Sequence, residues 1–546
     1  NARSFTSRNE LNDLHCSTGM LKCTNPWIPF TRLDEYLYLH YCENVLVFAF
    51  QGETEDAAIN FANFDEQSTQ VRIEIPPLSQ KDVPDIAPVP AFDVIRLHEV
   101  ISVPTQSLDL SADALPRMNT GRIFTLPAWD ARQLWLTIDT SSLAPGVWST
   151  TVEARTLEVE SRTFSIPLEI TVSKHALPKP LPLHHCNWGY TYSTPRMQAL
   201  EDAALVDRVA HGEDVFVSSL IPQATYDADG ALVGAIDFAK HDDFVTRYSP
   251  HGMILFQSYG GLTGPAPIDT PAGKRAYVAW LRAWVAHLKD MGIGYEKYAM
   301  YPIDEPGLNE GLVKAYLDFA KCAREADPNI LMYTDPVERI RAEELTEMLP
   351  YVDLWCPNRD GFFLGRNEDK LAIIQNSGKP VWMYACADNA KHQSPLGYYR
   401  AQSWEAYRFD LEGIGFWSYC TSSADPWYRP DGTLDYLLVY PGDDVVVSKR
   451  WEAVRDGMED HAMLKQLEAA KDKAKAENRA PESVAAAETL LTEDVARIGD
   501  FNGRDSDGTT PGADGLEGVR TVEDRRFDAI QQCRRQIDAL LTALEE

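Results

Sequence analysis

The sequence has no apolar run that approaches the roughly 20 residues a helix needs to cross a bilayer. We therefore expect no membrane span. The first ten residues, NARSFTSRNE, are polar and lack the apolar core of a signal peptide. This absence leads us to expect a mature or trimmed chain.

Basic residues are scarce. The 51 Lys and Arg residues stand against 82 Asp and Glu residues, which gives a formal net charge of −31. Such an excess of negative charge argues against a nucleic-acid partner and against binding to an anionic membrane surface. It does not identify a substrate. The hydrophobic fraction of 44% is that of a globular chain.

Paired metal-binding motifs are also missing. The nine cysteines contain no CxxC pair. Cys16 and Cys23 are near enough in sequence to form a disulfide, but the sequence does not decide whether they do. The adjacent His184 and His185 face opposite sides of an apolar strand, and no further ligand stands at a suitable spacing. We therefore expect no metal and no cofactor.

Residues 1–176 have the pattern of an antiparallel β-sandwich, which we interpret as a support domain without chemistry of its own. Short runs alternate apolar and polar residues and are rich in β-branched types, and Pro and Gly separate them. The predicted strands are Val45–Phe50, Thr69–Ile75, Leu134–Asp139, Trp148–Ala154 and Phe164–Val172.

A Pro-rich hinge, Leu177–Leu183, begins a second segment, predicted at residues 177–465. Short apolar runs alternate there with amphipathic helical segments. Eight strands alternating with helices predict a catalytic (β/α)8 TIM-like barrel, with an open parallel sheet as the alternative. The strand candidates are Leu183–Tyr190, Asp214–Leu220, Gly252–Gly260, Tyr298–Asp304, Ile330–Pro336, Val352–Asn358, Pro380–Cys386 and Ile414–Cys420.

Residues 466–546 form the third predicted segment, a C-terminal helical extension. Two long helices are predicted, at Ser448–Glu477 and Val522–Glu546, and an Asp/Gly-rich loop, Gly499–Gly518, lies between them. The acids of this loop lack the ligand spacing of an EF-hand. We therefore expect a solvated loop rather than a calcium site.

Two carboxylates stand side by side in the run YPIDEP, at Asp304 and Glu305. Adjacent side chains on a regular strand point to opposite faces. Both can reach a ligand only where the strand ends, and Pro306 favours an ending because it removes a ladder donor. In a (β/α)8 barrel the catalytic groups gather at these strand ends. We predict that Asp304 and Glu305 are the catalytic pair of a glycosidase.

Other predicted strand ends carry side chains suited to a sugar. Aromatic rings offer flat apolar faces to sugar C–H surfaces, and Asn, Gln and Asp can fix hydroxyl groups. Asp335 has an alternative role as the cap of the turn before Pro336. The predicted substrate-binding residues are Trp188, Tyr190, Gln257, Tyr259, Tyr333, Asp335, Asn358, Trp382, Tyr384, Trp417 and Tyr419.

No Glu follows the seventh predicted strand, where the run Tyr384–Ala390 offers only Asp388. A double-displacement retaining glycosidase needs a second carboxylate about 5 Å from its acid. The missing Glu favours attack by the substrate's own 2-acetamido oxygen. Glu305 would then protonate the leaving oxygen and later deprotonate water. Asp304 would orient the acetamido N–H and stabilise the oxazolinium-like intermediate.

The chain resembles glycoside hydrolase family 123, the β-N-acetylgalactosaminidases that act by substrate assistance, with an N-terminal β-sandwich. The architecture matches over about residues 40 to 470. The resemblance implies that Asp304 orients the acetamido group and that Glu305 is the acid/base. It rests on three runs: Asp304-Glu305-Pro306, Gly413–Tyr419, and Arg450–Leu464 with Arg455, Gly457 and Asp460.

We therefore predict an exo-acting retaining hydrolase that removes terminal β-linked N-acetylgalactosamine, or another 2-acetamido hexose, from a glycan or glycolipid. One alternative is a hydrolase for a non-acetamido glycoside, with Asp388 or Asp335 as its second carboxylate. Another is an inactive carbohydrate-binding protein. The resemblance implies a secreted, periplasmic or cell-surface location. The sequence does not indicate the oligomeric state.

Overall fold

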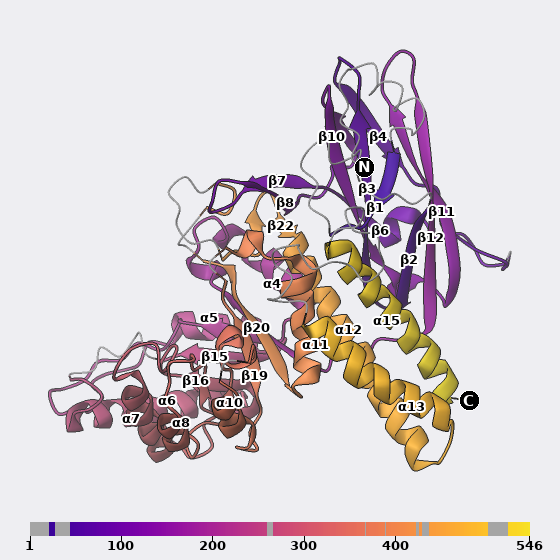
Figure 1. The fold of residues 1–546 in the computed structure, drawn as a ribbon. Helices are drawn as coiled ribbons and strands as arrows, with labels where there is room; N and C mark the ends of the chain where they lie inside the picture. Colours follow the sequence, from indigo (N-terminus) through magenta and orange to yellow (C-terminus); the bar gives the residue numbers. More distant parts are fainter. Residues whose placement is uncertain are drawn as a thin grey trace. The chain divides into compact units, whose positions relative to one another are not determined.

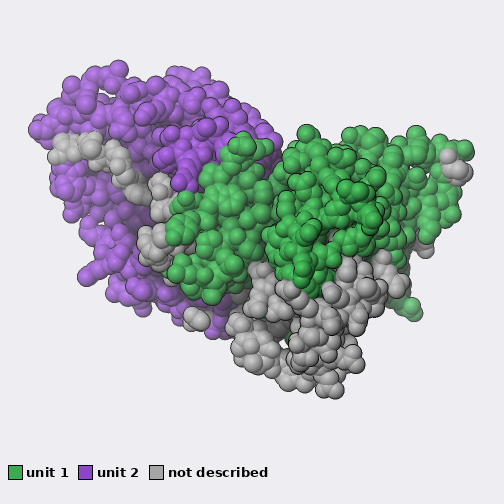
Figure 2. Space-filling view, turned by 90° about the horizontal axis from the view of Figure 1, so that it is seen from above, with its two compact units in different colours: residues 1–182, 389–408, 424–546 green, residues 183–388, 409–423 purple. Residues whose placement is uncertain are grey.

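The computed structural model describes residues 21–27, 44–83, 85–258, 266–365, 367–387, 389–421, 425–428, 436–500 and 522–545. These residues belong to two compact units, which Figure 2 colours separately. Unit 1 comprises residues 1–182, 389–408 and 424–546, and unit 2 comprises residues 183–388 and 409–423. The units thus do not follow chain order. The division at residues 176 and 465 stays a prediction.

Unit 1 begins with two β-sheets (Figure 1). One has the order β1-β3-β10-β6 and the other β2-β12-β11-β4-β9, with β5 paired to β11. The bounds of these strands are β1 Leu21–Thr24, β2 Val45–Gln51, β3 Thr54–Asn63, β4 Thr69–Glu74, β5 Ser79–Gln80, β6 Ile95–Glu99, β9 Ile123–Leu126, β10 Asp130–Asp139, β11 Gly146–Thr156 and β12 Thr163–Ala176.

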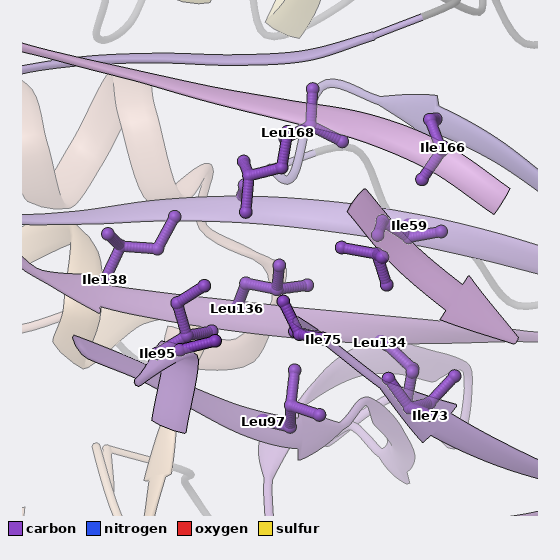
Figure 3. Close-up of a cluster of buried hydrophobic side chains, with 14 of the residues drawn as sticks. Ile59, Ile73, Ile75, Ile95, Leu97, Leu134, Leu136, Ile138, Ile166 and Leu168 are labelled. Carbon is purple, nitrogen blue, oxygen red and sulfur yellow. The ribbon is translucent and has the colours of Figure 1, made fainter. Parts of the chain in front are cut away.

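The two sheets share one hydrophobic core. Side chains of β3, β6 and β10 meet those of β4 and β12 in Figure 3, among them Leu136, Ile73 and Leu168. Alternate residues of a strand face one side of its sheet, so the alternation read in the sequence is what builds this core. Each buried aliphatic side chain of this size contributes about 1.5–3 kcal/mol.

One strand pair departs from the antiparallel prediction. β2 runs parallel to β12, with Val45 opposite Leu168, whereas the other pairs in both sheets are antiparallel. The physical reason is connectivity. Parallel neighbours cannot be joined by a hairpin, and here most of the two sheets lies between the two strands in the chain.

The remainder of unit 1 is a small sheet and a group of helices. The small sheet has the order β21-β22-β8-β7, and α12 follows it directly in the chain. Ser448 caps α12 by accepting the N–H of Trp451. The elements are β7 Ile101–Pro104, β8 Leu110–Leu115, η6 Pro395–Arg400, α11 Ala401–Arg408, β21 Tyr440–Pro441, β22 Val445–Ser448, α12 Lys449–Ala476, α13 Pro481–Thr489, η7 Leu490–Asp494, α14 Val495–Gly499 and α15 Val522–Glu545.

The Asp/Gly-rich loop predicted at Gly499–Gly518 lies almost entirely outside the described residues. The described helices supply one further finding. None of them is both long enough and apolar enough to cross a bilayer.

Buried ion pairs hold α12 inside unit 1. Two of its carboxylates pair with arginines of η6 and α15, and its Arg455 pairs with β3; removing one partner of such a buried pair typically costs about 3–5 kcal/mol. The pairs, each at 2.7 Å, are Arg400 with Asp456 and Asp460, Arg455 with Asp56, and Arg534 with Asp460. Arg534 also lies 2.7 Å from Glu53, which extends the network to the residue before β3. This arrangement agrees with a structural role for the Arg455–Asp460 run.

The carboxylates in this network outnumber the arginines, and this imbalance gives a pH prediction. Burial, opposed by Arg534, raises the pKa of Glu53 from 4.5 to about 8. The folded protein therefore holds a proton that the unfolded chain releases above its own pKa. Stability from this group is fully present below about pH 4.5 and is lost as the pH rises toward 8.

We expect Glu53→Gln to flatten the fall in unfolding free energy between pH 5 and 8, by up to about 1.4 kcal/mol per pH unit. Asp460→Asn is the matched contrast. Against the effect of burial, Arg400 and Arg534 hold the pKa of Asp460 below its ordinary value, so this variant is expected to be destabilised at neutral pH. Urea unfolding at each pH measures both. An unchanged slope in Glu53→Gln would contradict the assignment.

Unit 2 contains eight short parallel strands. Seven lie within the segments predicted from the sequence, and β20 begins one residue before its predicted segment. Helices follow most of them. The strands are β13 His184–Gly189, β14 Val215–Ser218, β15 Met253–Gln257, β16 Tyr298–Tyr301, β17 Tyr333–Thr334, β18 Leu354–Trp355, β19 Trp382–Ala385 and β20 Gly413–Cys420. The helices are α4 Glu201–Ala210, α5 Ala239–Tyr248, α6 Pro271–Asp290, α7 Leu312–Ala326, α8 Ala342–Met348, α9 Arg359–Phe362 and α10 Glu368–Gln375.

The ladders of unit 2 form two parallel sheets. Six strands follow the order β16-β15-β14-β13-β20-β19, and β17 pairs with β18. Isolated parallel bridges join the two sheets, from Met300 to Met332 on one side and from Trp355 to Val381 and Asn358 to Tyr384 on the other. The described structure is therefore two sheets linked by bridges rather than one continuous eight-stranded ladder.

Candidate active site

Asp304 and Glu305 lie just beyond the end of β16, where the sequence predicted a strand end. The backbone of Glu305 has φ of +47°, in the left-handed region that non-glycine residues adopt rarely. Its N–H donates to Oδ1 of Asp335 at 3.1 Å, which holds this conformation. The two adjacent acids are thus outside a regular strand and are not forced onto opposite faces.

Asp335 follows β17 and is only 1% exposed, beneath the pair. Its second oxygen, Oδ2, contacts the hydroxyl of Tyr301, and the same hydroxyl contacts Oδ1 of Asp304. Tyr301 is fully buried and was missing from the predicted site. The available signal was its position, as the last strand residue three places before Asp304.

The carboxylate of Glu305 accepts a hydrogen bond from a different tyrosine, Tyr384. The Tyr384 hydroxyl, on β19, donates to Oε1 of Glu305 at 2.5 Å. Burial is the main cause that raises the pKa of Glu305, the charge of Asp304 adds to it, and the Tyr384 hydrogen bond opposes it. A raised pKa suits a carboxyl group that must carry a proton to a leaving group near neutral pH.

The acids of this site have no cationic partner within the described residues, where no Lys, Arg or His forms an ion pair with Asp304, Glu305 or Asp335. Desolvation raises the pKa of Asp304, although the Tyr301 hydrogen bond opposes it. Burial raises the pKa of Asp335 well above its ordinary value, and the charge of Asp304 adds to this. The site therefore favours retaining protons.

An aromatic group borders Glu305. Trp188, at the end of β13, packs against Tyr384 with ring centroids 5.7 Å apart. Trp417 on β20 lies 6.4 Å from Trp188 and 5.6 Å from Tyr190, and both Trp417 and Tyr190 are half-buried. Gln257, at the end of β15, donates to the Tyr190 hydroxyl at 3.0 Å. Tyr384 joins this group to Glu305, and the partly exposed rings are those of Tyr190 and Trp417.

Two predicted residues lie elsewhere. Trp382 is the first residue of β19 and packs against His184, the first residue of β13, so it lies at the opposite strand ends. The Tyr419 hydroxyl donates to Oδ2 of Asp207 on α4 at 2.8 Å, on the helix side of the sheet. Strand alternation explains the position of Tyr419, and the place of Trp382 at the start of β19 explains the other.

Two more have supporting positions. Tyr333 is fully buried, and its ring meets that of Tyr301 edge-on at 4.7 Å. Asn358 caps α9, because its Oδ1 accepts the N–H of Gly361 at 3.1 Å. Tyr259 and Asp388 lie outside the described residues.

One group of potential metal ligands is present among the described residues, at His241, Asp242 and His287. The indole N–H of Trp284 donates to Nε2 of His241 at 2.7 Å, so the proton of this imidazole is on Nδ1. Nδ1 then donates to Asp242 at 2.9 Å, and Nε2 of His287 contacts the same carboxylate at 2.8 Å. These hydrogen bonds connect α5 to α6, which gives the three residues a structural role.

Comparison with known proteins identifies the family of the central region. Residues 265–467 match the model of the glycoside hydrolase 123 catalytic domain. No curated protein sequence matches the chain. A solved family 123 glycoside hydrolase from Clostridium perfringens, described in work on glycolipid glycan hydrolysis, is similar with a TM-score of 0.72 and 12% identity, covering 96% of this chain and 98% of that one.

A family 39 glycoside hydrolase from Bacteroides cellulosilyticus WH2 is similar only with a TM-score of 0.38 and 10% identity, over 76% of this chain and 81% of that one. That value is too low to support an inference. The family 123 structure shows the fold, and the family model covers Asp304, Glu305, Asp335 and Tyr384. Residues 265–467 are thus a glycoside hydrolase family 123 catalytic domain, which confirms the resemblance seen in the sequence and supports glycoside hydrolysis as the reaction of this chain.

Proposed function

We propose that the protein is an exo-acting retaining glycoside hydrolase that removes terminal β-linked N-acetylgalactosamine, or another 2-acetamido hexose, by substrate assistance. One observation carries this proposal. Asp304 and Glu305 stand together beyond β16, each held by a tyrosine hydroxyl, while Asp335, a carboxylate linked to both by hydrogen bonds, is buried and already engaged through both oxygens.

The proposed roles follow from the contacts. Glu305, bonded to Tyr384, protonates the glycosidic oxygen while the acetamido oxygen attacks the anomeric carbon and the aglycone leaves. Water then opens the oxazolinium intermediate and gives its proton to Glu305, so the configuration is retained. Asp304 accepts the acetamido N–H and stabilises the positive charge of the intermediate. Tyr384 is the candidate for positioning the acetamido carbonyl, provided that the substrate takes over the hydroxyl hydrogen that Tyr384 donates to Glu305 in the free protein.

The surroundings support assistance over a protein nucleophile. Residues 382–387, from the start of β19 to the last residue described before position 388, contain no carboxylate. Asp335 is 1% exposed and offers no free oxygen to an anomeric carbon. A double displacement through Asp335 is therefore disfavoured. The role of Asp388 is left to the substrate test.

We further infer that the eight parallel strands of unit 2 close into a (β/α)8-like barrel. Two observations support this. The bridge from Met300 to Met332 links the two sheets at the β17 edge, and the bridge from Trp355 to Val381 links them at the β18 edge. One buried cluster also takes side chains from all eight strands except β20, whose Trp417 packs against it. Closure would bring the carboxyl ends of the strands together, as this site requires.

The substrate prediction is direct. We expect aryl 2-acetamido-2-deoxy-β-glycosides to be cleaved, with the galacto epimer preferred over the gluco epimer at C4. The matching plain hexosides lack the internal nucleophile and are expected to show no turnover above background. A thiazoline analogue of the intermediate should inhibit competitively. Rapid turnover of plain hexosides would contradict substrate assistance and favour Asp388 as a nucleophile, and turnover of no glycoside would favour a binding protein.

The aglycone and the location are part of the same proposal. The Clostridium perfringens enzyme is described as acting on glycolipid glycans. We propose that this chain removes the terminal sugar from a glycan or glycolipid outside the cytoplasm, in a secreted, periplasmic or cell-surface setting. Release of the monosaccharide alone from a defined oligosaccharide, with no larger fragment, tests the exo mode.

A further inference from the structure

The hydroxyl of Tyr301 is shared between two carboxylates. It lies within hydrogen-bond distance of Oδ1 of Asp304 and of Oδ2 of Asp335. A phenol has one hydrogen, so it can donate to only one of these oxygens. Its contact with the other is then a contact between two acceptors, which is repulsive unless that carboxyl group carries a proton of its own and donates it to the phenol oxygen.

Burial decides which carboxyl group keeps the proton. Asp335 is 1% exposed, whereas the side chain of Asp304 is exposed and Glu305 is intermediate. Isolated charge is most costly for the most buried group. The charged groups that act most strongly on Asp335 are Asp304 and Glu305, whose negative charges add to the cost of ionising it. The other titratable neighbours are Tyr301, Tyr316, Tyr333, Tyr384 and Cys356.

We propose that Asp335 is a neutral carboxylic acid that donates through Oδ2 to Tyr301, which in turn donates to the carboxylate of Asp304. Asp335 and Tyr301 are then positioning residues. Every hydrogen bond in this series then has one donor and one acceptor. Oδ1 of the neutral Asp335 still accepts the N–H of Glu305 at 3.1 Å.

The neutral state of Asp335 does not depend on the proposed function. Its effect on the binding of an acetamido group does. With Oδ1 of Asp304 fixed by Tyr301, Oδ2 is the oxygen left to accept an acetamido N–H. The same Asp335 holds the left-handed backbone of Glu305. One buried neutral acid would therefore orient both members of the pair without adding a third negative charge to the site.

Asparagine distinguishes a neutral acid from an ionised one at position 335. Its amide N–H can donate to Tyr301 and its carbonyl can accept from Glu305, which is what the neutral acid does. We expect Asp335→Asn to lose no more than about tenfold in kcat/KM, about the effect of one neutral hydrogen bond, with an unchanged pH profile. Asp335→Ala should lose about 100-fold, because the pair is misplaced.

Asp304→Asn is the matched control, since the same change at the ionised acid is expected to be far more harmful. If Asp335→Asn lost as much activity as Asp335→Ala while its melting temperature stayed close to wild type, Asp335 would be an ionised acceptor and the inference would be wrong. Tyr301→Phe should lower kcat and leave KM for an activated aryl glycoside little changed, because it removes the orientation of Asp304.

A spectroscopic test does not depend on activity. The infrared difference spectrum of wild type minus Asp335→Asn, at neutral pH, should contain the carbonyl stretch of a neutral carboxylic acid, because the other carboxyl groups cancel. Tyr301→Phe should shift this band. A carboxylate band in its place would overturn the inference. If no glycoside is hydrolysed but the acid band is present, the proposed function fails and the inference stands.

Discussion

Glu305→Gln is expected to lower kcat/KM by about 10²–10⁴ on 2-acetamido glycosides with poor leaving groups, the usual contribution of a general acid/base. Gln keeps the size of the side chain and can still meet the Tyr384 hydroxyl, but it cannot donate a proton to the glycosidic oxygen. Activated aryl glycosides need little protonation, so the variant should lose much less on them. A series of leaving groups measured with both enzymes gives the comparison.

The pH profile adds a second measurement to this variant. Burial raises the pKa of Glu305, so the protonated acid persists to a higher pH than for an exposed Glu. Wild-type kcat/KM should therefore fall on the alkaline side as Glu305 ionises, and the variant should lack this limb. Glu310→Gln, an exposed residue of the same loop, is the matched control and should behave as wild type. Equal losses on all leaving groups would exclude Glu305 as the acid.

Asp304→Asn is expected to lower turnover on every 2-acetamido glycoside by about 10²–10³, whatever its leaving group, because charge stabilisation in the transition state is lost. The amide can still accept from Tyr301, so the local geometry should survive, but it cannot balance the positive oxazolinium. The diagnostic result is a uniform loss across the leaving-group series, in contrast to Glu305→Gln. The same series with Asp290→Asn, an exposed change at the end of α6, controls for surface charge.

The thiazoline inhibitor separates binding from chemistry in this variant. It resembles the cyclic intermediate, so Asp304→Asn should weaken its binding in proportion to the loss in kcat/KM. Retention of near wild-type affinity and turnover would place Asp304 outside the acetamido site. A loss confined to poor leaving groups would instead assign it to proton transfer.

The sequence predicted the acid pair because the relevant information is local. An apolar run, two adjacent acids and Pro306 together mark a strand end, and β16 ends at Tyr301, three residues before the predicted end. The eight strand positions were predictable for the same reason. Tyr301 and Asp335 were not assigned to each other, because their contact depends on the neighbouring placement of β16 and β17, which the sequence does not show.

Side-chain direction was the least predictable property. Tyr384 and Tyr419 were both predicted to bind substrate, but Tyr384 reaches Glu305 and Tyr419 reaches Asp207. A shift of one position exchanges the two faces of a strand. Trp382 was misplaced for a related reason, because the order of residues along β19 decides which end of the sheet each one occupies. Residue type determines neither the face of the strand on which a side chain lies nor its position along the strand.

Unit 1 is built from three separate segments of the chain, and this has a consequence for its synthesis on the ribosome. Arg534 bonds to Glu53, 481 positions earlier in the chain. During translation, Glu53 is therefore made long before the guanidinium that pairs with it, and all of residues 183–388 emerge in between. Unit 1 cannot reach its described packing until unit 2 has been synthesised. A ribosome that stops before α15 releases strands whose buried acids lack Arg534.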